Sequence, residues 1–230
     1  MTEHEQTTGW WQQAVTRFKS HWLLKMLGTT ASITAFMCVY FWLLRHPAYP
    51  VTIMPLTSVD RMIGFTAWSL IPYATLWLYI SLVPALLNLE WRELAPYLSA
   101  VSLLSLTGFV IFFFWPTAIP KPDIDWTQHP SIEFLKSVDT SGNACPSLHV
   151  AFAVLTALWL HRLLRRMNAP ALVHILNVCW CVLIAWSTLA TKQHVLLDLK
   201  AGAILGLAIA VLHLYVLPRL RSLQQAPESG

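Results

Sequence analysis

Six stretches of this chain are long, apolar and almost free of formal charge. Five contain no Asp, Glu, Lys or Arg, and the sixth, residues 147–164, holds Arg162 as its one such residue. Crossing a bilayer takes roughly 20 helical residues, and continuous apolar runs indicate helices rather than the alternating strands of a barrel. The six runs are residues 26–44, 62–89, 95–120, 147–164, 167–191 and 201–218.

The composition agrees with a membrane location. Apolar side chains make up 56% of the 230 residues and charged ones 11%. In a soluble domain, by contrast, about a quarter of the residues are charged. The net charge of +4 does not indicate a nucleic-acid partner, because the chain has no run of Lys or Arg. We therefore expect an all-α integral membrane protein of six transmembrane helices, with residues 1–230 forming one domain.

The distribution of Lys and Arg predicts the orientation. Three Arg fall in the short loop 161–168 and two in the C-terminal tail, and such residues favour the cytoplasmic side. Both termini are then cytoplasmic, and residues 116–145 form an extracytoplasmic loop. This loop is either a lid or acceptor site, or a surface helix built on Ile132, Phe134, Leu135 and Val138. The short loops suggest a multi-pass protein of a bacterial inner membrane.

Residues 1–21 precede the first span. Within them, large apolar side chains fall near one helical face, which is typical of an interfacial helix on the cytoplasmic leaflet. The alternative is that this segment extends the first span. The side chains concerned are Trp10, Trp11, Ala14, Val15 and Phe18.

Two polar clusters border the apolar runs, where ionisable groups are costly unless paired or hydrated. They are residues 143–149 and 187–198, and the predicted topology places both on the outer side. We therefore expect them to meet. Pro146 suits the first turn of a helix, so the amides from Ser147 to His149 would form a helix N-terminus that attracts phosphate.

His194 and Asp198 are four residues apart and share a helical face. A carboxylate in this position can accept the Nδ1 proton of the imidazole and leave Nε2 as a nucleophile or base. Two alternatives remain open: a pair at a helix start with no chemistry, and a zinc site with His149. The zinc site lacks the second His at i+4 that a helical two-His site needs, so we expect no metal.

These segments resemble the motifs of the type 2 phosphatidic acid phosphatase (PAP2) superfamily. Ser187, Thr188, His194 and Asp198 match the spacing of its third motif, and Pro146-Ser147-Leu148-His149 resembles its second. The first motif of the superfamily aligns with the segment from Phe114 to Lys121 and Pro122. Three identities depart: Phe114 replaces Lys, while Lys121 and Thr188 replace Arg. Leu148 stands where the second motif has Gly. In this respect the sequence resembles the branch of inositol phosphorylceramide synthases and inositol phosphotransferases.

The resemblance implies a helical core and a two-step reaction. His194 would attack phosphorus to form a phosphohistidine, Asp198 would orient it, and His149 would act as general acid and then base. The groups expected to hold the phosphoryl oxygens are Lys121, Lys192, Ser147, the amides near Leu148, and more weakly Ser187 and Thr188. No cofactor is required.

The implied activity is cleavage of a phosphorylated lipid, or of a polyprenyl phosphate or diphosphate. The alternative is transfer of a phospho-head group to an alcohol acceptor, which shares every step except the last. A competing class is a non-catalytic membrane carrier or assembly factor with a degenerate site. The expected partners are the phosphorylated lipid and membrane lipids, and the sequence does not indicate an oligomeric state.

Overall fold

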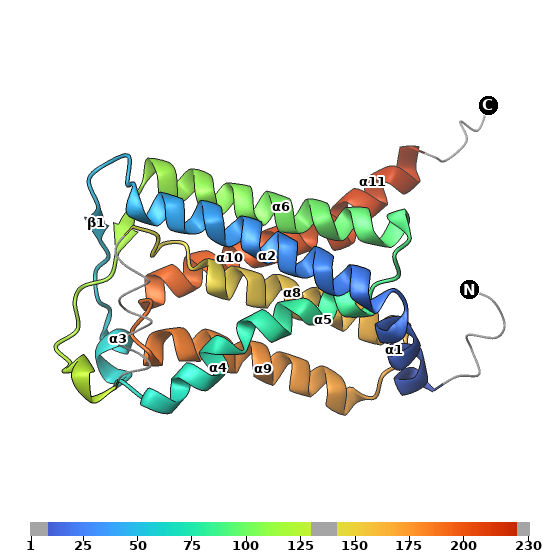
Figure 1. The fold of residues 1–230 in the computed structure, drawn as a ribbon, viewed down its shortest axis with the longest axis horizontal. Helices are drawn as coiled ribbons and strands as arrows, with labels where there is room; N and C mark the ends of the chain where they lie inside the picture. The colour runs from blue at the N-terminus through green and yellow to red at the C-terminus, as the bar shows by residue number, and fades with distance from the viewer. Residues whose placement is uncertain (1–8, 130–141, 225–230) are drawn as a thin grey trace.

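A computed structural model of the chain describes residues 9–129 and 142–224. Within these residues six helical spans are long and apolar enough to cross a membrane, which confirms the expected all-α fold. They lie side by side as a bundle (Figure 1). The spans are α2 (Trp22–Arg45); η2 (Ala67–Ser69), α4 (Leu70–Ala74) and α5 (Leu76–Leu86); α6 (Trp91–Phe114); α8 (Leu148–Arg166); α9 (Ala171–Ala190); and α10 (Leu196–Val211), η4 (Leu212–Val216) and α11 (Leu217–Gln224).

Several span boundaries differ from the charge-free runs; for example, the third run continues to residue 120, whereas α6 ends at Phe114. Two of the differences bear on the polar clusters. The second run begins at residue 62, but Ser58–Met62 form a separate short helix, α3, and the spanning helix starts at Ala67. The last helix begins at Leu196, five residues before its charge-free run. Its first turn includes Asp198, whose carboxylate accepts the Val195 amide and so caps the helix start.

Helix α8 is the centre of the bundle. Of its spanning part, 61% is buried inside the chain, against 11% to 33% for the other five spans. It packs against α5, α9 and α10. A buried polar contact joins three of these helices, because the Tyr79 hydroxyl donates to Asn177 Oδ1 at 2.6 Å and Asn177 Nδ2 donates to the Ala157 carbonyl at 2.9 Å. Residues on α8 are thus held from several sides.

Two glycines on α10 allow its close approach to α8. A Cβ on Gly202 would lie 2.2 Å from the Ser147 carbonyl oxygen, and one on Gly206 would lie 2.3 Å from that of Ala151. Small residues four apart permit such backbone contact between membrane helices. The contact brings the start of α10 against the start of α8, which are the two elements that carry the polar clusters.

Short extended segments cover the same end of the bundle. Strand β1 (Thr52–Ile53) pairs in parallel with β2 (Thr117–Ala118). Thr117 also bridges to Asn143, so β2 joins the loop before the second span to the cluster that precedes α8. The loop 116–145 further contains η3 (Trp126–Gln128). The predicted amphipathic stretch at residues 132–138 lies outside the described residues.

The N-terminal segment forms a helix of its own, α1 (Trp10–Lys19). It ends before His21, whose positive φ of 52° separates it from α2, so the alternative of one continuous helix is wrong. Lys25 Nζ donates to the Arg17 carbonyl at 2.6 Å and to the Ala85 carbonyl at 3.0 Å, and ties α1 to α5. Figure 1 shows α1 and α11 at one end of the bundle and β1 and α3 at the other.

Candidate active site

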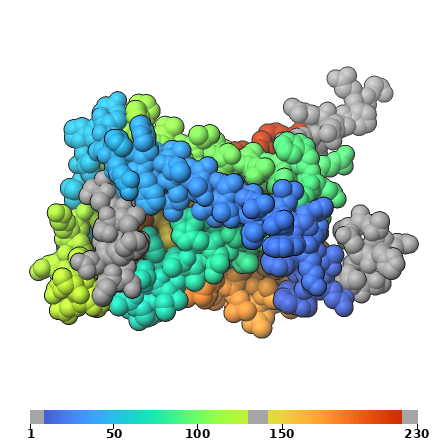
Figure 2. Space-filling view, viewed as in Figure 1, coloured from blue at the N-terminus to red at the C-terminus, as the bar shows by residue number. Residues whose placement is uncertain are grey.

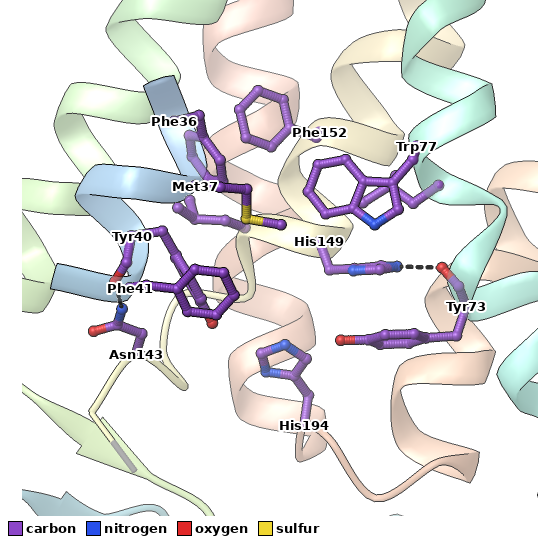
Figure 3. Close-up of a pocket in the computed structure, with 12 residues that line it drawn as sticks. Phe36, Met37, Tyr40, Phe41, Tyr73, Trp77, Asn143, His149, Phe152 and His194 are labelled. Carbon is purple, nitrogen blue, oxygen red and sulfur yellow. Dashed lines mark hydrogen bonds between the residues drawn. The ribbon is translucent and has the colours of Figure 1, made fainter. Parts of the chain in front are cut away.

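A cavity of about 130 Å³ lies at the end of the bundle that carries β1 and α3. Its walls come from α2, from α4 and α5, and from the first turns of α8, and His194 lies at its base (Figure 3). Figure 2 shows part of α8 between α2 and α4, where the surface is hollowed. The two polar clusters therefore meet in one cavity. This agrees with the predicted topology, which places both clusters on the same side of the membrane.

His194 and Asp198 are both buried, with exposed fractions of 9% and 0%. His194 Nδ1 lies 3.5 Å from Asp198 Oδ2, which is an ion-pair distance without a normal hydrogen bond. Catalytic hydrogen bonds are often long before a substrate binds. The His194 amide donates to the Thr188 carbonyl at 3.1 Å, so the end of α9 holds the loop that carries the imidazole.

His149 lies on the first turn of α8 and faces the same cavity. Its Nε2 is 2.9 Å from the Tyr73 carbonyl oxygen, and the two rings stack at 4.0 Å with 15° between their planes (Figure 3). A carbonyl oxygen only accepts, so Nε2 carries the proton of this imidazole. The tautomer is therefore set by a backbone group of α4, two residues before the break at Thr75.

The start of α8 is joined directly to the start of α10. The Ser147 amide donates to the Asp198 carbonyl at 3.0 Å, and the Ser147 hydroxyl accepts the Val150 amide at 3.4 Å as the N-cap. The amides of Leu148 and His149 belong to the first helical turn, where no intrahelical acceptor exists. These two residues line the cavity, and the N-terminal end of α8 favours an anion there.

Helix α3 braces the His194 loop from outside. Asp60, which is 8% exposed, accepts the Leu196 amide through Oδ1 at 2.7 Å. Its Oδ2 accepts both the amide and the hydroxyl of Thr57 at 2.7 Å. Lys192 Nζ donates to the carbonyls of Asp60 and Ile63. No sequence pattern indicates this contact, because Asp60 and Leu196 are 136 positions apart.

The expected phosphate contacts divide into two groups. Ser147 and Leu148 lie at the α8 N-terminus, Leu148 lining the cavity. The Lys192 ammonium instead donates to a backbone carbonyl of α3. Lys121 is exposed. Neither lysine is among the residues that line the cavity. Ser187 and Thr188 are fully buried, and their hydroxyls donate to carbonyls of α9 itself, those of Ile184 and Ala185.

Buried polar atoms without a partner gather at this site. Among the described residues these atoms are Asn143 Oδ1, Gln193 Nε2, His194 Nδ1 and Asp198 Oδ1, all within the two clusters. Leaving such a group unpaired costs about 1–3 kcal/mol, so these atoms are expected to take polar partners, which water or a ligand can supply. Asn143 lines the cavity and its Nδ2 donates to the Tyr40 carbonyl at 3.0 Å, a role the sequence analysis did not assign.

Cys145 lies beside the Asp198 carboxylate. Burial, and secondly the neighbouring Asp198 carboxylate, raise the pKa of the Cys145 thiol to about 11. The thiol is therefore neutral at ordinary pH and serves as a small packing group. Within residues 9–129 and 142–224, no group of three or more His, Cys, Asp and Glu side chains is arranged to hold a metal ion.

Comparison with protein families identifies a match to the PAP2 superfamily. The model of the PAP2 superfamily covers residues 94–222, which include both polar clusters and more than half of the chain. Members of this superfamily are generally phosphatases or phosphotransferases. Comparisons with curated proteins and with solved structures return no match. The six-span helical fold, the converging clusters and the extent of the match establish that this chain belongs to the PAP2 superfamily.

Proposed function

We propose that this protein is a membrane phosphoesterase that cleaves a phosphorylated lipid through a phosphohistidine on His194. The observation that carries the proposal is the convergence of His194 and His149 on one cavity at the end of the bundle, with the buried Asp198 carboxylate 3.5 Å behind His194 Nδ1. Two of these residues come from one helix start and the third from another, so a common cavity is not a consequence of sequence proximity.

In the first step, Asp198 accepts a hydrogen bond from the Nδ1–H of His194, which keeps this proton on Nδ1 and leaves Nε2 with a free lone pair. Nε2 attacks phosphorus, a P–N bond forms, and the bond from phosphorus to the lipid oxygen breaks. His149 enters this step as the imidazolium and donates its Nε2 proton to the departing oxygen, which must replace the Tyr73 carbonyl as the hydrogen-bond partner of that nitrogen. Nδ1 keeps its proton, so a neutral imidazole remains.

In the second step, His149 accepts a proton from water as the water oxygen attacks phosphorus. The P–N bond breaks, phosphate leaves, and both imidazoles return to their starting protonation states. The amides of Leu148 and His149 at the α8 N-terminus are the groups we assign to the developing negative charge. This assignment replaces Lys192, whose ammonium group is held by α3.

The walls of the cavity support a lipid substrate. Phe36, Met37 and Phe41 of α2 line it together with Trp77 of α5 and Phe152 of α8 (Figure 3). The rings of Phe36 and Phe152 are in edge contact, with centroids 5.3 Å apart. Apolar walls with a few convergent polar groups are typical of a site that takes an amphiphilic ligand. A lipid tail lying between α2 and α5 would place its phosphate next to the two histidines.

The proposal includes an orientation. The Lys and Arg distribution predicts cytoplasmic termini, and α1 and α11 lie at the end of the bundle opposite the cavity. The active site then faces the periplasm or exterior of a bacterial inner membrane. Head groups on the outer leaflet would reach it without crossing the bilayer.

The test is turnover by the detergent-purified protein with phosphatidic acid, phosphatidylglycerol phosphate, polyprenyl diphosphate and a phosphorylated sphingolipid. We expect phosphate release and an acid-labile phosphoenzyme that are both lost in His194→Ala. The matched control is His174→Ala, which removes a histidine of α9 that does not line the described cavity and should retain activity.

Two other results would change the assignment. A new phospholipid formed when a polyol or lipid alcohol is added would identify a transferase, to which Leu148 in the second motif points. Binding of the phosphorylated lipid with no turnover in any arm would identify the non-catalytic carrier and overturn the proposal.

A further inference from the structure

A second and larger cavity lies at the other end of the bundle. Its volume is about 520 Å³, and it is enclosed by the start of α6, the end of α8 and the π-helical turn η4. None of its lining residues belongs to the cavity with the two catalytic histidines. The chemistry proposed above does not use it, so its composition needs a separate explanation.

Charged side chains line the mouth of this cavity. Arg92, Arg162 and Arg166 face it together with Glu90 and Glu93. Glu93 is already matched, because its carboxylate lies 3.4 Å from Arg166 Nη1 and accepts the Asn88 amide at 3.1 Å. Arg17 on α1 pairs with the same carboxylate at 3.7 Å. The charged groups that remain at the mouth are Arg92 and Arg162 against Glu90, so the net charge there is positive and favours an anion.

The turn η4 shapes the inner side of the mouth. π-Helical turns are rare and occur frequently at functional sites. The Arg162 guanidinium donates to the Leu214 carbonyl within this turn, which fixes the side chain on the cavity wall. Guanidinium carries five N–H donors in a planar fork, so one bond to a carbonyl leaves others for a phosphate.

The floor of the cavity is apolar. Trp159, Leu163 and Leu214 line it and are each at most 4% exposed. A cavity with arginines at the mouth and a buried apolar floor matches an amphiphile better than a small hydrophilic anion. Its place beside the helix ends matches the depth at which lipid head groups meet a membrane protein.

We propose that this cavity binds the head group of an anionic phospholipid, at a site separate from the catalytic one. The phosphate would accept hydrogen bonds from Arg92 and Arg166, whose side chains are exposed, and from Arg162 behind them. The first carbons of the lipid would lie over the apolar floor. The site selects for negative charge and needs no chemical step.

The experiment measures lipid retention by native mass spectrometry. The full chain carries His194→Ala throughout, so that no lipid is turned over, and is equilibrated with micelles containing equal phosphatidylglycerol and phosphatidylcholine. Arg92→Gln combined with Arg166→Gln removes two mouth charges. Arg165→Gln is the control, because it removes a neighbouring exposed charge of α8 that does not line the cavity.

We expect the starting protein and the Arg165→Gln control to retain phosphatidylglycerol in preference to phosphatidylcholine. The double variant should retain at least about tenfold less phosphatidylglycerol, because the loss of even one of its two charge-assisted hydrogen bonds has about that effect. Equal retention by all three proteins would overturn the proposal. Displacement of the lipid by millimolar inorganic phosphate would assign the site to a free anion and overturn the lipid assignment. Turnover by the protein with an intact His194 is measured separately, so the two proposals fail independently.

Discussion

Replacing Gly202 by Ala should separate the two halves of the proposed catalytic site. The added Cβ would lie 2.2 Å from the Ser147 carbonyl oxygen, whereas ordinary contact begins near 3.4 Å. Because the atom it meets is backbone, α10 must move away from α8 by about 1.2 Å, the difference between these distances. That movement carries Asp198 away from the start of α8, which bears His149.

We expect two measurable effects of this change. A displacement of about 1 Å in a reacting group costs on the order of 100-fold in rate, so kcat should fall by about that factor. Overpacking of a tight contact costs about 1–3 kcal/mol, so the melting temperature in detergent should also fall. The assay is phosphate release from the lipid of the test panel that the starting protein hydrolyses fastest, together with a thermal unfolding curve.

The control is Gly28→Ala on α2, where an added Cβ meets nothing within 4 Å. It should leave both kcat and the melting temperature unchanged. If a folded Gly202→Ala protein kept its activity within about twofold, close approach of α10 to α8 would not position the site. The reasoning from the glycine contact to the catalytic geometry would then be wrong.

Three further predictions concern groups around His194. Asp60→Asn puts an NH₂ group in place of an oxygen that accepts two hydrogen bonds from Thr57. The free energy of unfolding should therefore fall by about 1–3 kcal/mol, and kcat should fall as well. Thermal unfolding measures the first effect and turnover the second. Asp198→Asn removes the acceptor for the His194 Nδ1 proton, so kcat should fall by about 10⁴-fold with KM nearly unchanged. Cys145, as the remaining cysteine of a triple variant, should resist alkylation below its pKa of about 11, because the thiolate is the nucleophile.

Each of these has its own control and its own contrary result. Asp123→Asn, an exposed carboxylate in the loop after β2, should behave like the starting protein. An Asp60→Asn protein as stable as this control would show that α3 does not brace the loop. Asp198→Asn with near-normal kcat would exclude its orienting role. Rapid alkylation of Cys145 at pH 8 in the folded protein, as fast as in denaturant, would show that the thiol is neither buried nor beside a carboxylate.

Much of the architecture is predictable from the sequence because the signals are local. A charge-free run such as residues 95–120 indicates a spanning helix whatever it packs against. The reason is that each charged side chain placed in the membrane has its own free-energy cost. The i, i+4 spacing of His194 and Asp198 likewise reflects helix geometry alone. The Gly202 and Gly206 spacing is a local signal too, and it was available as a small-residue motif in the last span.

Side-chain direction is not local, and the sequence interpretation of the phosphate contacts shows the difference. Lys192 lies two residues before His194, so its charge suggested a phosphate contact, but its φ of 55° turns the chain and its ammonium group binds α3. Ser187 and Thr188 lie inside a helix whose own carbonyls accept their hydroxyls. Spacing alone does not tell where these side chains point.

The sequence by itself thus determined the membrane class, the number of spans and the identity of the two clusters that meet. Only the tertiary structure decided that the Tyr73 carbonyl holds His149, that Asp60 caps the start of α10, and that arginines surround a second cavity at the far end. The physical reason is that burial of apolar runs follows from composition along the chain. Hydrogen bonds between distant backbone and side-chain groups depend on how the helices pack in three dimensions.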